Sequence, residues 1–381
     1  MGLLSVYLGT AFILIILWDA FETIVLPRRV TRRIRFARFF YRSTWRPYSK
    51  LVCLISSQKR RESYLSYFGP ISLLILLTVW ASGLIVGFAL IFWAEDSILQ
   101  SREIAHSFFP SFYMSGTNFF TLGLGDITPR TTLARLLVMI EAGMGFGFLA
   151  LVIGYLPVLN QLFSRREVNV SLMDARAGSP PTAAEMLCRH SREYGLDALR
   201  QQLSNWESWA AELLESHLSY PVLALFRSQH YNQSWLATLT VILDTCALVM
   251  TWVEWSGAGQ AKLTFAMARH TVVDLSLAFG LSPPESSRDR LPLDGMTELR
   301  ARLAAAGLKF RSGDEIDRNL AERRRTYEPY VNTLPQFLCI TVPPFVAAAG
   351  RRDDWETSAR GPGRKELHEA AISGENEDEH F

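Results

Sequence analysis

The sequence contains three apolar runs that are each long enough to cross a lipid bilayer. They are Leu3 to Leu26, Pro70 to Ala94 and Leu136 to Phe163. A helix needs about 20 apolar residues to cross about 30 Å of hydrocarbon. Within a bilayer, a helix satisfies all of its own backbone hydrogen bonds, which a lone strand cannot do. The runs therefore predict an all-α membrane protein.

The first run differs from a cleaved signal peptide. A signal peptide needs a basic segment before a short apolar core. No basic residue precedes this run, and the run is longer than the apolar core of a signal peptide. It carries Asp19 and Glu22 in its last turns. We expect a retained N-terminal transmembrane helix within residues 1–27. The two acidic residues are expected to pair with Arg28 or Arg29, or with a charge on the rest of the membrane domain.

A basic block separates the first two runs, with no acidic residue before Glu62. It consists of Arg28, Arg29, Arg32, Arg33, Arg35, Arg38, Arg42, Arg46, Lys50, Lys59, Arg60 and Arg61. Next to membrane spans, a basic block is typical of a cytoplasmic loop rather than of a nucleic-acid site. Its side chains are expected to contact anionic lipid headgroups. We expect residues 28–69 to form a basic cytoplasmic linker, with headgroups at residues 28–61. The N-terminus is then outside and the C-terminal part cytoplasmic.

The C-terminal part has helical patterning over residues 164–345. Helices are expected at 183–218, 235–254, 260–281, 295–310 and 313–332. The apolar segment 235–254 is either a buried helix of a soluble domain or a fourth span, and the charged segments around it favour the buried helix. Residues 346–381 are charged and end in an acidic stretch, so they are expected to form a disordered tail.

Cysteine and histidine spacing gives no metal site. The four cysteines are too scattered for a disulfide scaffold, and no CxxC pair exists for zinc. His190, His217 and His230 match no ligand pattern. We expect no structural metal, no cofactor and no nucleic-acid partner. A regulator of the C-terminal domain is not identified by any motif.

A shorter apolar segment lies between the second and third runs. Residues 107–120 are too few to span but suit a re-entrant helix, with Ser107 as its cap and Pro110 in the first turn. They lead into Thr121-Leu-Gly-Leu-Gly-Asp126. The context excludes a phosphate loop and a dinucleotide fold, which need a GK[ST] ending or a third glycine. Irregular backbone at membrane depth is tolerated where it lines a path for water or is buried.

This segment resembles the selectivity filter of tetrameric potassium channels. The family pattern is T-V-G-Y-G-D followed by a Pro-x-Thr turn, and here Pro129 and Thr131 follow Asp126. The resemblance covers residues 70–163 and implies a pore domain with an outer helix, a pore helix, a filter at 121–126 and an inner helix. The fold class expected is a pore-loop cation channel module plus a mainly α-helical cytoplasmic domain. The resemblance also implies that the protein is located in the plasma membrane, which is the inner membrane of a bacterial cell.

The resemblance implies a role for each residue of the filter. The ion-binding residues implied are Thr121, Leu122, Gly123, Leu124 and Gly125, whose carbonyls would replace the hydration shell of K⁺. Asp126 would lie at the outer mouth. Glu141, an ionisable residue within a span, would support the pore helix from behind or contact ions. Gly143 and Gly147 are candidates for a gating hinge, or for close helix packing.

The sequence departs from the family pattern at two filter positions. Leu122 replaces the usual Val, and Leu124 replaces the Tyr whose hydroxyl ties the filter to the pore helix. One filter per chain cannot close a ring of four, so a homotetramer is expected. The leading function is a potassium channel. The alternatives are a weakly selective cation channel and a membrane-anchored signalling or scaffold protein with a non-conducting pore. We find no known catalytic motif in the sequence, so we do not expect an enzyme.

Overall fold

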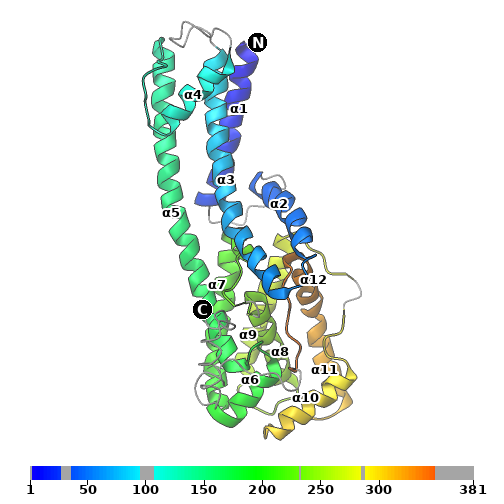
Figure 1. The fold of residues 1–381 in the computed structure, drawn as a ribbon. Helices are drawn as coiled ribbons and strands as arrows, with labels where there is room; N and C mark the ends of the chain where they lie inside the picture. The colour runs from blue at the N-terminus through cyan, green and yellow to red at the C-terminus, as the bar shows by residue number, and fades with distance from the viewer. Residues whose placement is uncertain (1, 27–35, 95–106, 231–232, 285–287, 348–381) are drawn as a thin grey trace, which may run out of the picture. The chain divides into compact units, whose positions relative to one another are not determined.

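A computed structural model of the chain describes residues 2–26, 36–94, 107–230, 233–284 and 288–347 (Figure 1). Over these residues every regular element is a helix, and bridge positions occur at Pro129 and between Val253 and Phe310. Three helices are long and apolar enough to cross a membrane. The all-α membrane fold predicted from the sequence is confirmed.

The chain divides into two compact units. The first comprises Met1–Phe163 and Ser216–Arg227, and the second comprises Ser164–Glu215 and Ser228–Phe381. The sequence analysis predicts a single division after Phe163. The segment Ser216–Arg227 instead groups with the first unit, because Tyr220 packs on Tyr155 and Phe226 packs on Phe163, with ring centroids 5.7 and 5.8 Å apart.

The first unit is built on the three candidate spans. They are α1 (Gly2–Ala20) with the π-helical turn Phe21–Val25, α3 (Gln58–Ala94), and α5 (Thr132–Ala177). Helix α5 continues for twenty residues past Pro157 and passes into the second unit, so this proline does not end the helix. The short helix α4 (Phe108–Phe119) packs against α3.

Small residues bring α1 and α3 close together. A side-chain carbon at Gly9 would lie 2.5 Å from the carbonyl oxygen of Gly87, and one at Gly87 would lie 3.1 Å from the carbonyl oxygen of Gly9. Close backbone approach through small residues is a common way for membrane helices to associate. The N-terminal helix is therefore an integral part of the first unit.

Asp19 joins three helices at the end of α1. Its carboxylate accepts hydrogen bonds from the backbone N–H of Ala37, at 3.2 Å to each oxygen, and from the indole Nε1 of Trp80 at 3.0 Å. Glu22 accepts a bond from Trp18 Nε1 at 2.8 Å. The expected partners Arg28 and Arg29 lie outside the described residues. The hydrogen bonds to Asp19 described above come from uncharged donors on α2 and α3. The alternative, a pairing with a charge on the pore domain, stays a prediction.

The basic linker predicted over residues 28–69 is largely helical where it is described. It contains α2 (Phe36–Val52) and the first turns of α3. The sequence analysis weighed only the charge of this segment. It missed the buried residues Ala37, Phe40, Trp45, Ser49 and Val52, which form one face of α2. The remaining linker residues 28–35 lie outside the described part.

The second unit is a helical domain centred on α8 (Trp235–Thr251). Its other helices are α6 (Ala183–Arg189), the major part of α7 (Leu196–Ser219), α9 (Ala258–Ala278), α10 (Leu293–Ala305), α11 (Asp314–Arg325) and α12 (Glu328–Leu338). Helix α8 has 17 residues, nearly all of them buried. This length and burial favour the buried helix over a fourth span.

Two of the predicted helices are interrupted. The helix expected over 183–218 breaks at Gly195, whose φ of 81° leaves the helical region. The helix expected over 313–332 breaks at Tyr327, which has a φ of −134° and precedes Pro329 by two residues. The predicted tail, residues 346–381, lies outside the described residues from 348 onward.

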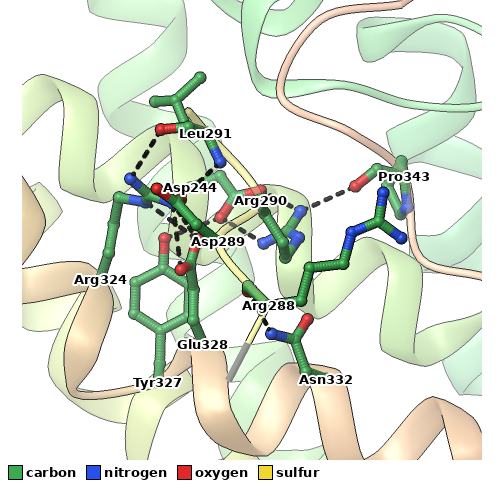
Figure 2. Close-up of polar contacts among 10 residues, drawn as sticks. All are labelled: Asp244, Arg288, Asp289, Arg290, Leu291, Arg324, Tyr327, Glu328, Asn332 and Pro343. Carbon is green, nitrogen blue, oxygen red and sulfur yellow. Dashed lines mark hydrogen bonds and ion pairs between the residues drawn. The ribbon is translucent and has the colours of Figure 1, made fainter. Parts of the chain in front are cut away.

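A buried polar network connects α8 with the C-terminal helices of the second unit (Figure 2). The guanidinium of Arg290 donates two bonds to Asp244 on α8, at 3.0 and 2.7 Å, and a third to the carbonyl of Pro343 at 2.7 Å. The hydroxyl of Tyr327 donates to Asp244 at 2.7 Å. Burial and the adjacent Asp244 carboxylate raise the pKa of Tyr327 well above its ordinary value, so its hydroxyl stays a donor.

A second arginine extends this network. Arg324 is paired with Glu328, at 2.8 Å, and with Asp289. The Phe345 ring lies against both guanidinium groups, 5.1 Å from Arg290 and 5.3 Å from Arg324. These contacts hold the segment after α12 on the domain. Since each buried charge has a partner, the network avoids the large cost of an isolated buried ion.

Candidate functional site

The short helix α4 positions the candidate site. It covers Phe108–Phe119, within one residue of the predicted re-entrant helix, and its buried Met114 and Phe119 belong to the core of the first unit. Ser107 occupies the N-cap position with extended backbone, but its side chain makes no capping bond. The negative end of the helix dipole lies at Phe119, next to the predicted filter, and favours a cation there.

The predicted filter has alternating backbone conformation. Thr121, Gly123 and Gly125 have positive φ angles of 55°, 55° and 79°, whereas Leu122 and Leu124 do not. Such alternation can turn successive carbonyls toward one side, which a row of cation ligands requires. Glycine adopts these angles at little cost, but a β-branched threonine rarely does. Strained backbone of this kind clusters at functional sites.

Hydrogen bonds hold the start of the filter on the end of α4. The N–H of Leu122 donates to the carbonyl of Thr117 at 2.8 Å, and the N–H of Thr121 donates to the carbonyl of Asn118 at 2.9 Å. In the single chain, residues 121–126 are exposed, and Leu122 and Leu124 are each 63% exposed. The start of the predicted filter is thus held on α4, while residues 121–126 are exposed in the single chain.

Asp126, at the end of the filter, contacts the pore helix. Its carboxylate accepts a hydrogen bond from the Tyr113 hydroxyl. Sequence reasoning notes that Leu124 cannot make the tyrosine bond of the family pattern, but it missed this tyrosine on α4. The signal that could have identified Tyr113 was a tyrosine hydroxyl within residues 107–120, the helix that directly precedes the predicted filter. The chain then enters α5, where Thr131 accepts a bond from the N–H of Ala134 at 3.1 Å.

Glu141 lies behind α4 and is completely buried. The hydroxyl of Ser115, also fully buried, is hydrogen-bonded to the Glu141 carboxyl and lies 2.8 Å from the carbonyl oxygen of Ile85. The three residues link α5, α4 and α3 directly behind the filter. A hydroxyl has one hydrogen, so it cannot donate to both oxygens at once. Both contacts are satisfied when the Glu141 carboxyl carries a proton and donates to Ser115.

The glycines of α5 differ in their surroundings. A side-chain carbon at Gly145 would lie 1.9 Å from the carbonyl oxygen of Phe119, so α5 passes directly against the end of the pore helix there. At Gly143, Gly147 and Gly154 the same atom would meet nothing within 4 Å. Of these four glycines, close packing within the chain requires only Gly145. The sequence analysis gives Gly143 and Gly147 as candidates for a gating hinge or for close helix packing. Within the chain the close packing is found at Gly145 instead, and the hinge stays a prediction.

The described residues contain no group of three or more His, Cys, Asp or Glu residues arranged to hold a metal ion. His190 and His217, weighed as metal ligands, are both buried, and His190 contacts the carbonyl of Met186 at 2.8 Å. His230 is exposed. The candidate site remains the predicted filter, with the helices α3, α4 and α5 that are linked behind it.

Comparison with known proteins bears on this site. Residues 74–159 match the family model described as "Ion channel". The match supports an ion channel. It begins within α3 and ends within α5, so it includes α4, the filter and Glu141. The match covers the pore-loop part of the first unit and leaves the second unit outside.

One curated relative is an uncharacterized membrane protein, YdjJ, of Bacillus subtilis (strain 168). It is 28% identical over 183 residues, which are 47% of this chain and 52% of the relative. The chain thus spans about half the length of the relative that it matches. No solved structure matches the chain. The chain is similar to a membrane protein, in agreement with its three candidate spans.

Proposed function

We propose that this protein is a potassium-selective channel that conducts K⁺ passively across the membrane. The observation that carries the proposal is the alternating backbone of Thr121–Gly125, held at the end of a short helix between two spanning helices. Carbonyl oxygens in such a row would replace the hydration shell of K⁺. Conduction of this kind needs no cofactor and no catalytic step.

The proposed channel is a homotetramer. One chain supplies one filter segment. In the single chain, all six residues 121–126 are exposed. Only 11% of the apolar window of α5 is buried within the chain. Four copies around one axis would line a pore with α5 and surround the ion with four sets of carbonyls.

The proposed location is the plasma membrane, the inner membrane of a bacterial cell. The basic residues between α1 and α3 favour the cytoplasmic side for that segment. This topology places the N-terminus outside, the mouth at Asp126 outside, and the second unit in the cytoplasm.

The test is ion flux into liposomes that contain the purified full chain. We expect K⁺ uptake by the native protein, little Na⁺ uptake, and loss of both in Gly123→Ala, because an added side chain is strained at a φ of 55°. Gly259→Ala in α9 is the control, since its added carbon meets nothing within 4 Å and its backbone does not have a positive φ. Equal loss in both variants, or no flux in the native protein under any condition, would contradict the proposal.

A weakly selective cation channel is the second candidate. The observation that favours it is Leu124, which is 63% exposed and has no group that can hydrogen-bond to the pore helix. Equal K⁺ and Na⁺ uptake that is lost in Gly123→Ala would support this candidate. An intact protein without flux would support a membrane-anchored scaffold instead.

A further inference from the structure

The segment Ser216–Arg227 leaves the second unit and returns to it. It follows and precedes residues of the second unit, but it belongs to the first unit. It contains the last residues of α7 and the 3₁₀ helix Pro221–Leu225, and the chain then continues into α8. We call Ser216–Arg227 the bridging segment. Both of its ends are continuous with helices of the second unit.

The bridging segment covers one face of α5. Its aromatic side chains pack on Tyr155 and Phe163, as described above. Leu159 lies midway between these two residues, and residues four apart share one side of a helix. Leu159 is 2% exposed and belongs to the same buried core as Leu223 of the bridging segment. In residues 146–163 of α5, Tyr155 and Leu159 are the buried residues. The covered face is therefore where the single chain buries this half of the span.

The bridging segment is also held on α3. The ring of Phe226 lies so close to Gly69 that a side-chain carbon at this glycine would be 2.7 Å from the ring. Arg227 forms an ion pair with Glu62 at 3.7 Å, and the two side chains are only 7% and 16% exposed. The bridging segment thus contacts α3 as well as α5, at the end of the span that leads into the second unit.

We propose that the bridging segment couples the second unit to α5 and thereby regulates conduction. The proposal rests on the proposed function in one point, the role of α5 as the helix that lines the pore. A rearrangement of the second unit that displaces α7 or α8 would act on the two ends of the bridging segment. Its aromatic contacts would pass that displacement to α5 at Tyr155 and Phe163. Contiguous packed side chains of this kind can carry energetic coupling between distant sites.

The first test measures the rate at which a maleimide reaches residue 159 beneath the bridging segment. The full chain carries Leu159→Cys, with Cys53 and Cys339 replaced by serine, and mass spectrometry locates the modification. Tyr220→Ala with Phe226→Ala removes both aromatic contacts with α5 and should raise the rate about tenfold or more. Tyr220→Phe keeps the ring and should leave the rate unchanged.

A milder variant keeps this test decisive if the double variant does not fold. Tyr220→Leu fills the same space with an aliphatic side chain and loses only the pair of rings. The modification rate at residue 159 should rise about threefold, the effect of one aromatic pair. Gln229→Ala, at an exposed residue just beyond the bridging segment, is the control and should change nothing.

The second test perturbs the second unit and reads the effect at α5. Asp244→Ala disrupts the buried network of Figure 2 and should raise the modification rate at residue 159 at least about fivefold. When Tyr220→Ala and Phe226→Ala are also present, Asp244→Ala should change the rate less than about twofold, because the contact that transmits its effect is gone. Asp197→Ala breaks only an exposed ion pair and should change neither rate.

K⁺ flux in liposomes shows whether this coupling regulates conduction. Asp244→Ala should change the flux at least about fivefold in the native background and less than about twofold with Tyr220→Ala and Phe226→Ala. The modification rates need no conduction, so a chain without flux would refute the proposed channel and leave the coupling itself testable.

Three results would overturn the proposal. One is an unchanged modification rate at residue 159 when the aromatic contacts are removed. Another is an equal effect of Asp244→Ala on that rate with and without these contacts, which would show that the bridging segment transmits nothing. The third is a conducting protein whose flux does not respond to Asp244→Ala.

Discussion

At the scale of single residues, Glu141 is expected to act as a hydrogen-bonding support for the pore helix. Glu141→Gln keeps the size of the side chain and supplies an N–H for Ser115, so it should conduct nearly as well as the native protein. Glu141→Ala removes the partner of Ser115 and leaves a buried gap. A lost partner of a buried polar group costs about 1–3 kcal/mol.

The measurement is K⁺ flux per amount of reconstituted protein in liposomes. We expect at least an approximately tenfold loss in Glu141→Ala, the effect of about 1.4 kcal/mol, and a flux near the native value in Glu141→Gln. If the glutamine variant lost flux as severely as the alanine variant, a charged carboxylate that contacts ions would replace the supporting role.

The contact between Gly145 and Phe119 predicts a second residue-scale effect. In Gly145→Ala, the new carbon would lie 1.9 Å from the Phe119 carbonyl oxygen, so α4 or α5 must shift. Overpacking of this kind costs about 1–3 kcal/mol and would displace the end of the pore helix that holds the filter. The thermal unfolding temperature and the K⁺ flux should both fall in Gly145→Ala. Both should stay near native in Gly154→Ala, whose added carbon would meet nothing within 4 Å. Equal behaviour of the two variants would contradict the packing described.

Single residues were predictable from the sequence only where a local pattern carried them. The residues with positive φ, Thr121, Gly123 and Gly125, lie in one contiguous motif that the sequence alone singles out. The role of Gly145 depends on the position of α4 relative to α5, which the sequence does not give. The bond from Tyr113 to Asp126 likewise joins residues thirteen positions apart. It depends on the path of the backbone between them, which the sequence alone does not predict. Contacts between elements decide such roles, and one sequence does not contain them.

At the scale of elements, the network around α8 should dominate the stability of the second unit. Asp244→Ala removes two acceptors from the buried Arg290 and one from Tyr327. Removing one partner of a buried ion pair costs about 3–5 kcal/mol. The exposed pair of Asp197 and Arg200, at 3.6 Å, is the control, since such pairs contribute about 0–1 kcal/mol.

Hydrogen exchange of the full chain measures this difference within the second unit. Amides of α8, α11 and α12 should exchange about a hundredfold faster or more in Asp244→Ala, because about 1.4 kcal/mol corresponds to a factor of ten. They should change little in Asp197→Ala. Unchanged exchange in Asp244→Ala would show that the network contributes nothing to stability.

The second unit should also lose stability in mild acid because of His190, near the end of α6. Burial lowers the pKa of this histidine below its ordinary value of about 6.5. Below pH 6.5 the unfolded chain binds a proton that the folded chain does not, so stability falls as the pH falls from there toward the folded pKa. The decrease in Tm between pH 7 and pH 5.5 should be smaller in His190→Asn than in the native chain.

The exposed His230 provides the control for this prediction. His230→Asn should keep the native dependence of Tm on pH. If both variants lost acid sensitivity to the same extent, or neither did, burial of His190 would not be the cause.

Elements were predictable where apolar residues are continuous. Three spans and the pore helix follow from runs of hydrophobic side chains, and the observed bounds of α4 differ from the prediction by one residue. Helix α2 was missed because its charge masked its buried face. The long predicted helices of the second unit split at Gly195 and Tyr327, because single residues set the backbone angles there.

At the scale of the whole molecule, the two units differ in how much of their fold can be predicted from the sequence. The first unit was predictable in outline because a bilayer restricts a chain to few folds. The second unit was predictable only as a set of helices, since its core depends on which apolar faces meet. Its buried network joins Asp244, Arg290 and Tyr327 across long stretches of chain, and no spacing rule relates them.

The reversal potential of the current through the purified full chain, with K⁺ on one side of a planar bilayer and Na⁺ on the other, tests the central claim most directly. A potassium-selective filter at Thr121–Gly125 predicts a large reversal potential set by K⁺, and no current in Gly123→Ala. A reversal potential near zero, or a current that survives in Gly123→Ala, would contradict the account.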